Sequence, residues 1–292
     1  MERGMTMERG LRRVAVLGDA DTERLHEVLA GRFEVHLQDP TSTAAGQDVD
    51  AIVTACASDV ELETALLGPQ GYLSRERKGL LLVDVSPVSE ALSREIDEAA
   101  RRAGVHYLRA PLTVGPGEGG AQAYTAMVSG PREDYERALE LLEALASKIV
   151  WLGAGEEARA MTRVLDVMTG VSMAMWAEAL VFGEAVGLDW REMLEVMQTS
   201  AIGSPVIQSH TSLVATRDFG SSHGCEQMVQ RLGDALAHGK TTGTVLTLTG
   251  MAHQMYLGAL AHGRASEGLA AIIPWLEKAA GTNPGDGRTV TR

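Results

Sequence analysis

The first half of the chain alternates short apolar runs with longer segments in which apolar residues recur at helical spacing. Apolar runs of this length predict buried strands, and they cover residues 14–17, 33–37, 51–54, 80–83, 105–108, 124–128 and 148–152. The segments between them predict helices, one ending near Leu29 and others over 60–67, 89–103 and 132–146. Strands and helices alternating in this way are typical of a doubly wound α/β domain with a mostly parallel sheet, which we expect over residues 1–152.

The second half of the chain has a different periodicity. From residue 156 to about 186 there is no proline, and apolar residues recur at helical spacing, which predicts one long helix. Further helices are predicted over 190–198, 226–238, 247–261 and 268–278. We therefore expect an all-α domain over residues 153–280. The turn-forming segment 281–292 is expected to be a disordered tail.

Composition and charge narrow the classes of partner. The chain has 292 residues and a formal net charge of −13, and such an acidic surface repels nucleic acid and anionic lipid. The N-terminal segment lacks the apolar stretch of a signal peptide, and no apolar run reaches membrane-spanning length. The two cysteines and the scattered histidines form no metal-binding motif. We expect a cytoplasmic protein with no nucleic-acid partner, no membrane partner and no metal.

Several short motifs follow one another along the chain in a fixed order. They are Val83-Asp84-Val85-Ser86, Ala110-Pro111-Leu112-Thr113-Val114-Gly115, Gly153-Ala154-Gly155, Ala177-Glu178-Ala179-Leu180 and Gly187-Leu188-Asp189. In this order and spacing they resemble the β-hydroxyacid dehydrogenase family, over about residues 12–280. The resemblance implies a Rossmann-type domain that binds NAD or NADP, a long linking helix and a helical domain that dimerises. It also implies a small-molecule substrate or ligand in the interdomain cleft.

The turn after the first strand departs from the pattern that a dinucleotide needs. Small residues there let the backbone approach the pyrophosphate, whose charge is held by free N–H groups of the following helix. Here Gly18 is retained, but Ala20 and Glu23 replace the second and third glycines, and Asp19, Asp21 and Glu23 are acidic. Either these acids cap the helix, or they repel the pyrophosphate. We expect dinucleotide binding to be weak or absent, with a Kd above roughly 100 μM.

Four further residues complete the predicted cofactor-binding set. Asp39 ends the second strand and suits ribose hydroxyls, which favours NAD over NADP. Cys56 and Ser86 follow the ends of two later strands, and Gln230 stands where the family carries a lysine.

The family's catalytic lysine is also replaced. The resemblance places Arg159 at that lysine and Arg163 at the asparagine that follows it. Arginine stays charged at working pH, so Arg159 can clamp a carboxylate but cannot exchange protons. Arg159, Arg163 and Asp166 share one helical face, and Asp166 is either paired with Arg163 or functionally perturbed. Thr113 matches the serine that binds the substrate carboxylate in relatives.

Three functional hypotheses stay open. The first is a divergent oxidoreductase that moves hydride from a nicotinamide, with water or Asp166 supplying the proton. The second is a non-catalytic pseudo-dehydrogenase that keeps the fold as a binding or scaffolding module. The third is a repurposed enzyme, for instance one resembling imine reductases, or one in which Arg159 and Arg163 clamp an anion. A homodimer is expected because Met173, Met175, Trp176 and Phe182 add large apolar area to the long helix.

Overall fold

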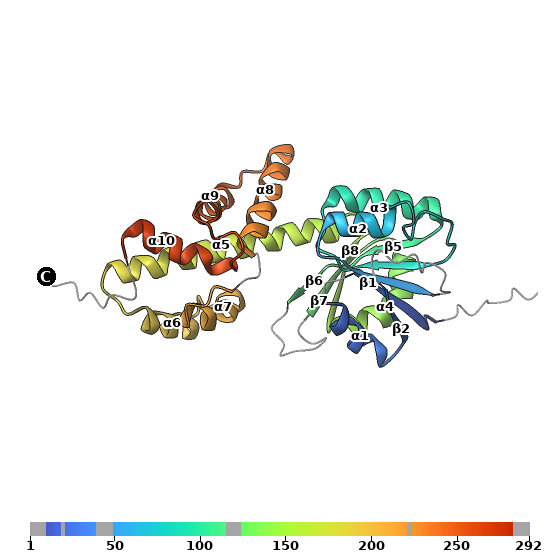
Figure 1. The fold of residues 1–292 in the computed structure, drawn as a ribbon, viewed down its shortest axis with the longest axis horizontal. Coiled ribbons are helices and arrows are strands. Elements are labelled where there is room, and N and C mark those ends of the chain that lie inside the picture. Colours follow the sequence, from blue (N-terminus) through green and yellow to red (C-terminus); the bar gives the residue numbers. More distant parts are fainter. Residues whose placement is uncertain (1–9, 19–20, 39–48, 115–123, 221–223, 283–292) are drawn as a thin grey trace, which may run out of the picture. The chain divides into compact units, whose positions relative to one another are not determined.

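The computed structural model describes residues 10–18, 21–38, 49–114, 124–220 and 224–282. The chain forms two compact units, Met1–Thr162 and Arg163–Arg292, which divide inside the long helix α5 (Glu157–Ala185) (Figure 1). Of the expected disordered tail, residues 283–292 lie outside the described part of the chain.

The first unit is built on an eight-stranded sheet with the order β2-β1-β3-β4-β5-β7-β6, in which β8 pairs with β7. The strands are β1 (Arg13–Gly18), β2 (Glu34–Gln38), β3 (Ala51–Ala55), β4 (Leu81–Asp84), β5 (His106–Arg109), β6 (Leu112–Val114), β7 (Tyr124–Ser129) and β8 (Lys148–Gly153). The first five strands are mutually parallel, whereas β7 runs antiparallel to β5 and β6. The expected mostly parallel sheet is confirmed, and β6 is an addition to it.

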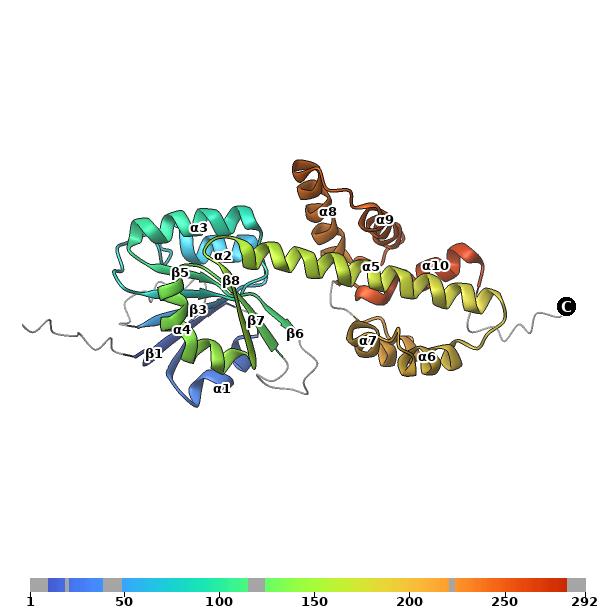
Figure 2. The ribbon, with the colours of Figure 1, turned by 180° about the vertical axis from the view of Figure 1, so that it is seen from behind.

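Helices cover both faces of this sheet. Successive strand residues point to opposite faces, so Val14 and Val16 join a core with α1 (Thr22–Ala30) and α4 (Arg132–Leu145). On the opposite face, Ala15 and Leu17 pack against α2 (Asp59–Leu67) and α3 (Glu90–Ala103). The two helix layers are visible above and below the sheet in Figure 1 and, from behind, in Figure 2. Strands buried on both sides explain the continuous apolar runs in the sequence.

The second unit is all-α, as expected. Its further elements are α6 (Trp190–Thr199), α7 (Pro205–Ala215), α8 (Gly224–Thr242), α9 (Thr247–Ala261), the short 3₁₀ helix η2 (Leu269–Ala271) and α10 (Ile272–Ala280). Trp176 and Leu180 of α5 belong to a core that also holds Met228 and Tyr256. Helix α7 was not predicted, although Ser204 caps its N-terminus and Pro205 occupies its first turn, both of which are helix-start signals.

Helix α5 confirms the long helix expected over residues 156–186 and corrects two expectations. By length and composition alone it is apolar enough to cross a membrane, contrary to the expectation that no segment is. It nevertheless contributes buried residues to the core of the second unit, as the core helix of a soluble protein does. The apolar side chains expected to form a dimer surface also divide between two faces. Met173 and Trp176 are buried in this core, whereas Met175 and Phe182 are exposed.

Candidate cofactor and catalytic site

The end of β1 makes a turn that only glycine can adopt. Gly18 has a φ of +142°, and a Cβ at this position would overlap the carbonyl oxygen of Ala55 at the end of β3. The strand order reverses here, because β2 lies on one side of β1 and β3 on the other. The carboxyl edge of the sheet at such a reversal is where α/β proteins bind ligands.

The helix that follows this turn has an uncapped N-terminus. Asp21 is the N-cap residue of α1 and adopts a left-handed conformation, with a φ of 53°, but its side chain makes no capping hydrogen bond. The expectation that the acidic residues cap this helix is therefore wrong for Asp21. The carboxylate of Asp21 is 65% exposed and lies 3.4 Å from Nη2 of Arg24. Asp19, Ala20 and Asp39 lie outside the described residues.

Arg24 is a residue of this region that the sequence did not single out. Its guanidinium lies 4.2 Å from the ring centroid of Tyr124, at the start of β7. Its Nε and Nη1 atoms are buried and have no hydrogen-bond partner in the described structure. The sequence gives no sign of this contact, because Tyr124 lies far from Arg24 along the chain.

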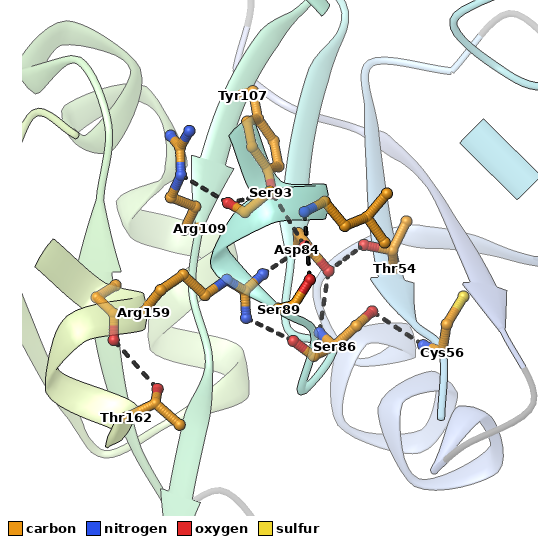
Figure 3. A network of polar contacts seen from close by, with 12 residues as sticks. Thr54, Cys56, Asp84, Ser86, Ser89, Ser93, Tyr107, Arg109, Arg159 and Thr162 are labelled. Carbon is orange, nitrogen blue, oxygen red and sulfur yellow. Dashed lines mark hydrogen bonds and ion pairs between the residues drawn. The ribbon is translucent and has the colours of Figure 1, made fainter. Parts of the chain in front are cut away.

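Asp84, at the end of β4, is the centre of a buried polar network (Figure 3). Its Oδ1 accepts hydrogen bonds from Thr54 Oγ1 at 2.8 Å and from the backbone N–H of Ser86 at 3.0 Å. Its Oδ2 accepts from the Tyr107 hydroxyl at 3.0 Å and from Arg159 Nη2 at 2.5 Å. The carboxylate is fully buried, and each of its oxygens has two donors, so its charge is well compensated.

Arg159 is held inside this network and does not face solvent. Only 3% of the residue is exposed, and Nη1 donates to the Ser86 carbonyl oxygen at 2.6 Å. Burial alone would lower the pKa of Arg159, but the charges of Asp84 and Glu156 and the contact with Tyr107 together outweigh it and raise that pKa above its usual value. The guanidinium therefore stays charged, and its two Nη groups are engaged by the protein. This leaves Nε as the buried donor without a partner.

The same network ties the ends of several strands together. The backbone N–H of Cys56, just after β3, donates to Ser86 Oγ at 3.0 Å. Arg109, at the end of β5, donates from Nε to Ser93 Oγ at 2.9 Å and pairs with Glu156, just before α5. Burial and the nearby charge of Asp84 raise the pKa of Tyr107, so its phenol stays protonated. The carboxyl edge of the sheet is thus a rigid platform joined to the start of α5.

The predicted site residues fall into separate groups. Gly18, Cys56, Ser86 and Arg159 are linked through this edge of the sheet. Thr113 lies on β6, half-buried and paired in register with Thr125. Arg163, Asp166 and Gln230 belong to the second unit, where Gln230 is exposed on α8.

Asp166 is a partly buried carboxylate with an arginine partner on α8. Arg231 Nη1 lies 3.3 Å from Asp166 Oδ1, and the Asp166 side chain is 13% exposed. Burial raises the pKa of Asp166, although the charges of Arg231 and Arg163 oppose the rise. The sequence predicted either a pair with Arg163 or a perturbed carboxylate. The structure gives Asp166 an ion pair with Arg231 and a raised pKa, and the charge of Arg163 also acts on it.

Sequence and structure comparisons point to one family of oxidoreductases. Residues 7–153 match the family described as the NAD binding domain of 6-phosphogluconate dehydrogenase. Residues 153–276 match the family described as NAD-binding of NADP-dependent 3-hydroxyisobutyrate dehydrogenase. The two matches meet at Gly153, where β8 ends and the chain leads into α5.

Individual relatives align over most of the chain. The 2-(hydroxymethyl)glutarate dehydrogenase of Eubacterium barkeri is 29% identical over 240 residues, which is 82% of this chain and 80% of the relative. The human mitochondrial 3-hydroxyisobutyrate dehydrogenase is 25% identical over 239 residues, or 80% and 71% of the two chains. The solved 3-hydroxyisobutyrate dehydrogenase of Salmonella typhimurium superposes with a TM-score of 0.78 at 20% identity, covering 90% of this chain and 99% of that one.

Proposed function

The chain belongs to the β-hydroxyacid dehydrogenase family, and from this premise we propose an NAD(P)-dependent oxidoreductase in which Arg159 has a structural role at the position of the family's lysine. The observation that carries the proposal is the engagement of Arg159 by Asp84 and the Ser86 carbonyl oxygen inside the first unit. A lysine can act as an acid and a base when burial lowers its pKa. An arginine with a raised pKa, locked in an ion pair, cannot do so.

The described part of the cofactor region fits a dinucleotide in two respects and opposes it in one. Gly18 has a positive φ that suits glycine and lies against the Ala55 carbonyl, and the N-cap side chain of Asp21 makes no capping hydrogen bond to α1. When bound, the nicotinamide group supplies or accepts a hydride. Asp21 and Glu23 bring negative charge to the same turn. We propose that binding is retained but weak, and that Asp39 gives a preference for NAD.

A proton source other than Arg159 is needed if the substrate gains or loses a proton. Asp166 is the candidate, because its raised pKa makes it a better proton donor near neutral pH than an ordinary aspartate. Arg231, its partner at 3.3 Å, would hold the carboxylate in place while the proton moves. A protonated imine would demand even less of the protein, since its nitrogen already carries the positive charge that hydride addition neutralises. An imine substrate is therefore a second candidate beside a hydroxy acid.

The engagement of Arg159 equally favours a non-catalytic relative that binds a dinucleotide without turning a substrate over. The two readings differ in a measurable way. Hydride transfer by the purified protein would be followed at the nicotinamide absorbance, with 3-hydroxy acids in the oxidising direction and cyclic imines in the reducing direction. Slow turnover that Asp166→Asn abolishes supports the oxidoreductase, and binding without turnover supports the non-catalytic relative. Oxidation of 3-hydroxyisobutyrate by the unmodified protein at an ordinary enzymatic rate, above about 1 s⁻¹, would contradict the non-catalytic relative and the purely structural role of Arg159.

We also propose that two copies associate through the exposed face of α5. Met168, Met175 and Phe182 are 61%, 56% and 70% exposed, and they recur every seven residues. This spacing returns to the same helix face after two turns and is the repeat with which one helix packs along another. Val164 and Val186 extend the stripe at both ends and are also more than half exposed. A second copy of the chain, which carries the same stripe, is a matching partner for this seam.

A further inference from the structure

Arg24 carries a charge that the described protein only partly neutralises. Its side chain is 24% exposed, and Nη2 lies 3.4 Å from the exposed carboxylate of Asp21. Nε and Nη1 are buried, and no described residue accepts a hydrogen bond from them. Buried donors on a charged group are costly to leave unpaired. The residue is therefore better suited to a complex with an anion than to the free protein.

Tyr124 fixes the guanidinium before any anion arrives. The ring centroid lies 4.2 Å from the central carbon of the guanidinium, within the range of a cation–π contact. Tyr124 is itself held in the sheet, where it pairs in register with Val114 of β6. Little side-chain entropy is thus lost when an acceptor binds to Arg24.

The position of Arg24 identifies the class of anion. Arg24 lies in the first turn of α1, which follows the tight turn at Gly18 and has no capping side chain from Asp21. A helix N-terminus without a side-chain cap and a guanidinium with two unpaired donors both favour an anion with several oxygens, and phosphate is the group that arginine binds best in this way. Asp21 and Glu23 both come just before Arg24 and make the start of α1 acidic, so the positive charge of Arg24 is needed there for an anion to bind.

We propose that Arg24, held on Tyr124, binds a phosphate group of the dinucleotide. Its guanidinium then supplies part of the phosphate binding that backbone N–H groups supply in other members of the fold, where small residues allow a close approach. This inference rests on the proposed function for the identity of the ligand, but not for the need of Arg24 for a phosphate-like anion. Asp21 competes for the same guanidinium and limits the affinity.

The test measures binding and stability and does not depend on catalysis. Calorimetric titration with NAD⁺ and with inorganic pyrophosphate would compare the unmodified protein, Arg24→Met, Arg24→Lys and a matched control. Arg132→Met is that control, because Arg132 also lies over aromatic rings, those of Tyr135 and Trp151, but already bonds Glu136 and is exposed. The melting temperature of each ligand-free protein is measured in parallel.

We expect Arg24→Met to raise the Kd for both probes at least about tenfold, the effect of losing hydrogen bonds to a charged group. The Kd of Arg24→Lys should lie between those of the unmodified protein and Arg24→Met. Arg132→Met should bind both probes as the unmodified protein does. Ligand-free Arg24→Met should melt no lower than the unmodified protein, because it removes buried donors that have no partner. A clear drop in melting temperature would instead assign Arg24 a structural role and overturn the proposal.

The other outcomes separate the two proposals. Equal binding of NAD⁺ by Arg24→Met and the unmodified protein would overturn the role of Arg24 and leave the dinucleotide function intact. Binding of pyrophosphate that depends on Arg24, without binding of NAD⁺, would uphold the anion site and overturn the dinucleotide function. Binding of neither probe by the unmodified protein would overturn both.

Discussion

Arg159 and Asp84 form an ion pair of 2.5 Å in which neither side chain is exposed by more than 3%. The pair joins the start of α5 to the end of β4, and the Tyr107 hydroxyl and the Ser86 backbone complete it on both sides. A position that the family resemblance marks as catalytic has therefore become part of the framework of the first unit.

Removing one partner of this pair should destabilise the protein strongly. Arg159→Met leaves the Asp84 carboxylate buried without its main counter-charge, and breaking a buried pair in this way costs about 3–5 kcal/mol. The double variant Asp84→Asn with Arg159→Met removes both charges and should lose clearly less than the sum of the single losses. Urea unfolding of the unmodified protein, the single variants Arg159→Met and Asp84→Asn, and the double variant gives the coupling energy between the two residues. Strictly additive losses would mean that the two residues do not stabilise each other.

Restoring the lysine should restore an exchangeable proton. In Arg159→Lys the ammonium faces Asp84, which favours its charged form, so oxidation of a 3-hydroxy acid should become measurable mainly as the pH is raised. General-base catalysis contributes about 10²–10⁴-fold, and we expect the gain over the unmodified protein to be near the lower limit. The pH profile of kcat/KM for Arg159→Lys, with Arg159→Met as the control, checks this. An equal gain in Arg159→Met would show that the lysine is not the cause.

Much of the fold follows from local patterns, whereas the site depends on distant contacts. The apolar runs of β1, β3 and β4 and the uninterrupted periodicity of α5 are local signals, and the structure confirms the elements that they predict. The short strand β6 escaped prediction because three residues carry too little periodicity, and it is defined by its pairing with β7.

The chemistry of the site was less predictable. The replacement of the family's lysine by arginine is visible in the sequence, but its burial against Asp84 is not, since the two residues are 75 positions apart. The contact between Arg24 and Tyr124 is hidden for the same reason. Asp166 was recognised as an unusual carboxylate in an apolar run, yet its partner Arg231 comes from another helix, 65 positions away. Sequence pattern thus identified unusual residue types and could not identify their partners.

The second unit should lose stability as the pH rises through neutrality. Burial, aided by the charge of Glu277 and opposed by Arg217, raises the pKa of Glu184 to about 7. A carboxyl group whose folded pKa is raised favours the folded state while it is protonated. Its contribution is therefore complete below its unfolded pKa and is lost as the pH rises toward about 7. Glu184→Gln should remove this part of the decline in melting temperature between pH 5 and 8. The exposed Glu195→Gln is the control, and an unchanged slope in Glu184→Gln would contradict the assignment.

Charge on the exposed stripe of α5 should prevent association. Phe182→Glu places a carboxylate at the most exposed member of the heptad series, where a second copy would have to bury it. Sedimentation velocity at micromolar concentration should show a dimer for the unmodified protein and a monomer for Phe182→Glu. Val60→Glu, at an equally exposed position of α2 in the first unit, should leave the dimer intact. A stable monomer of the unmodified protein would refute the dimer.

The acidic turn after β1 should weaken dinucleotide binding by an amount that can be recovered. Asp21→Asn removes a carboxylate that competes for Arg24, and Glu23→Gln removes a second negative charge from the first turn of α1. Each change should lower the Kd for NAD⁺ by roughly fivefold at low salt, about 1 kcal/mol, and the gain should shrink as salt screens the charges.

The replacement Asp19→Leu, Ala20→Gly and Glu23→Gly should raise affinity further, because small residues let the pyrophosphate approach the backbone. None of these variants should gain 3-hydroxy acid oxidation, since Arg159 remains locked to Asp84. Calorimetric titration at two salt concentrations gives the measurement. Affinities that are tight in the unmodified protein and unaffected by these changes would mean that the carboxylates face solvent and do not oppose the ligand.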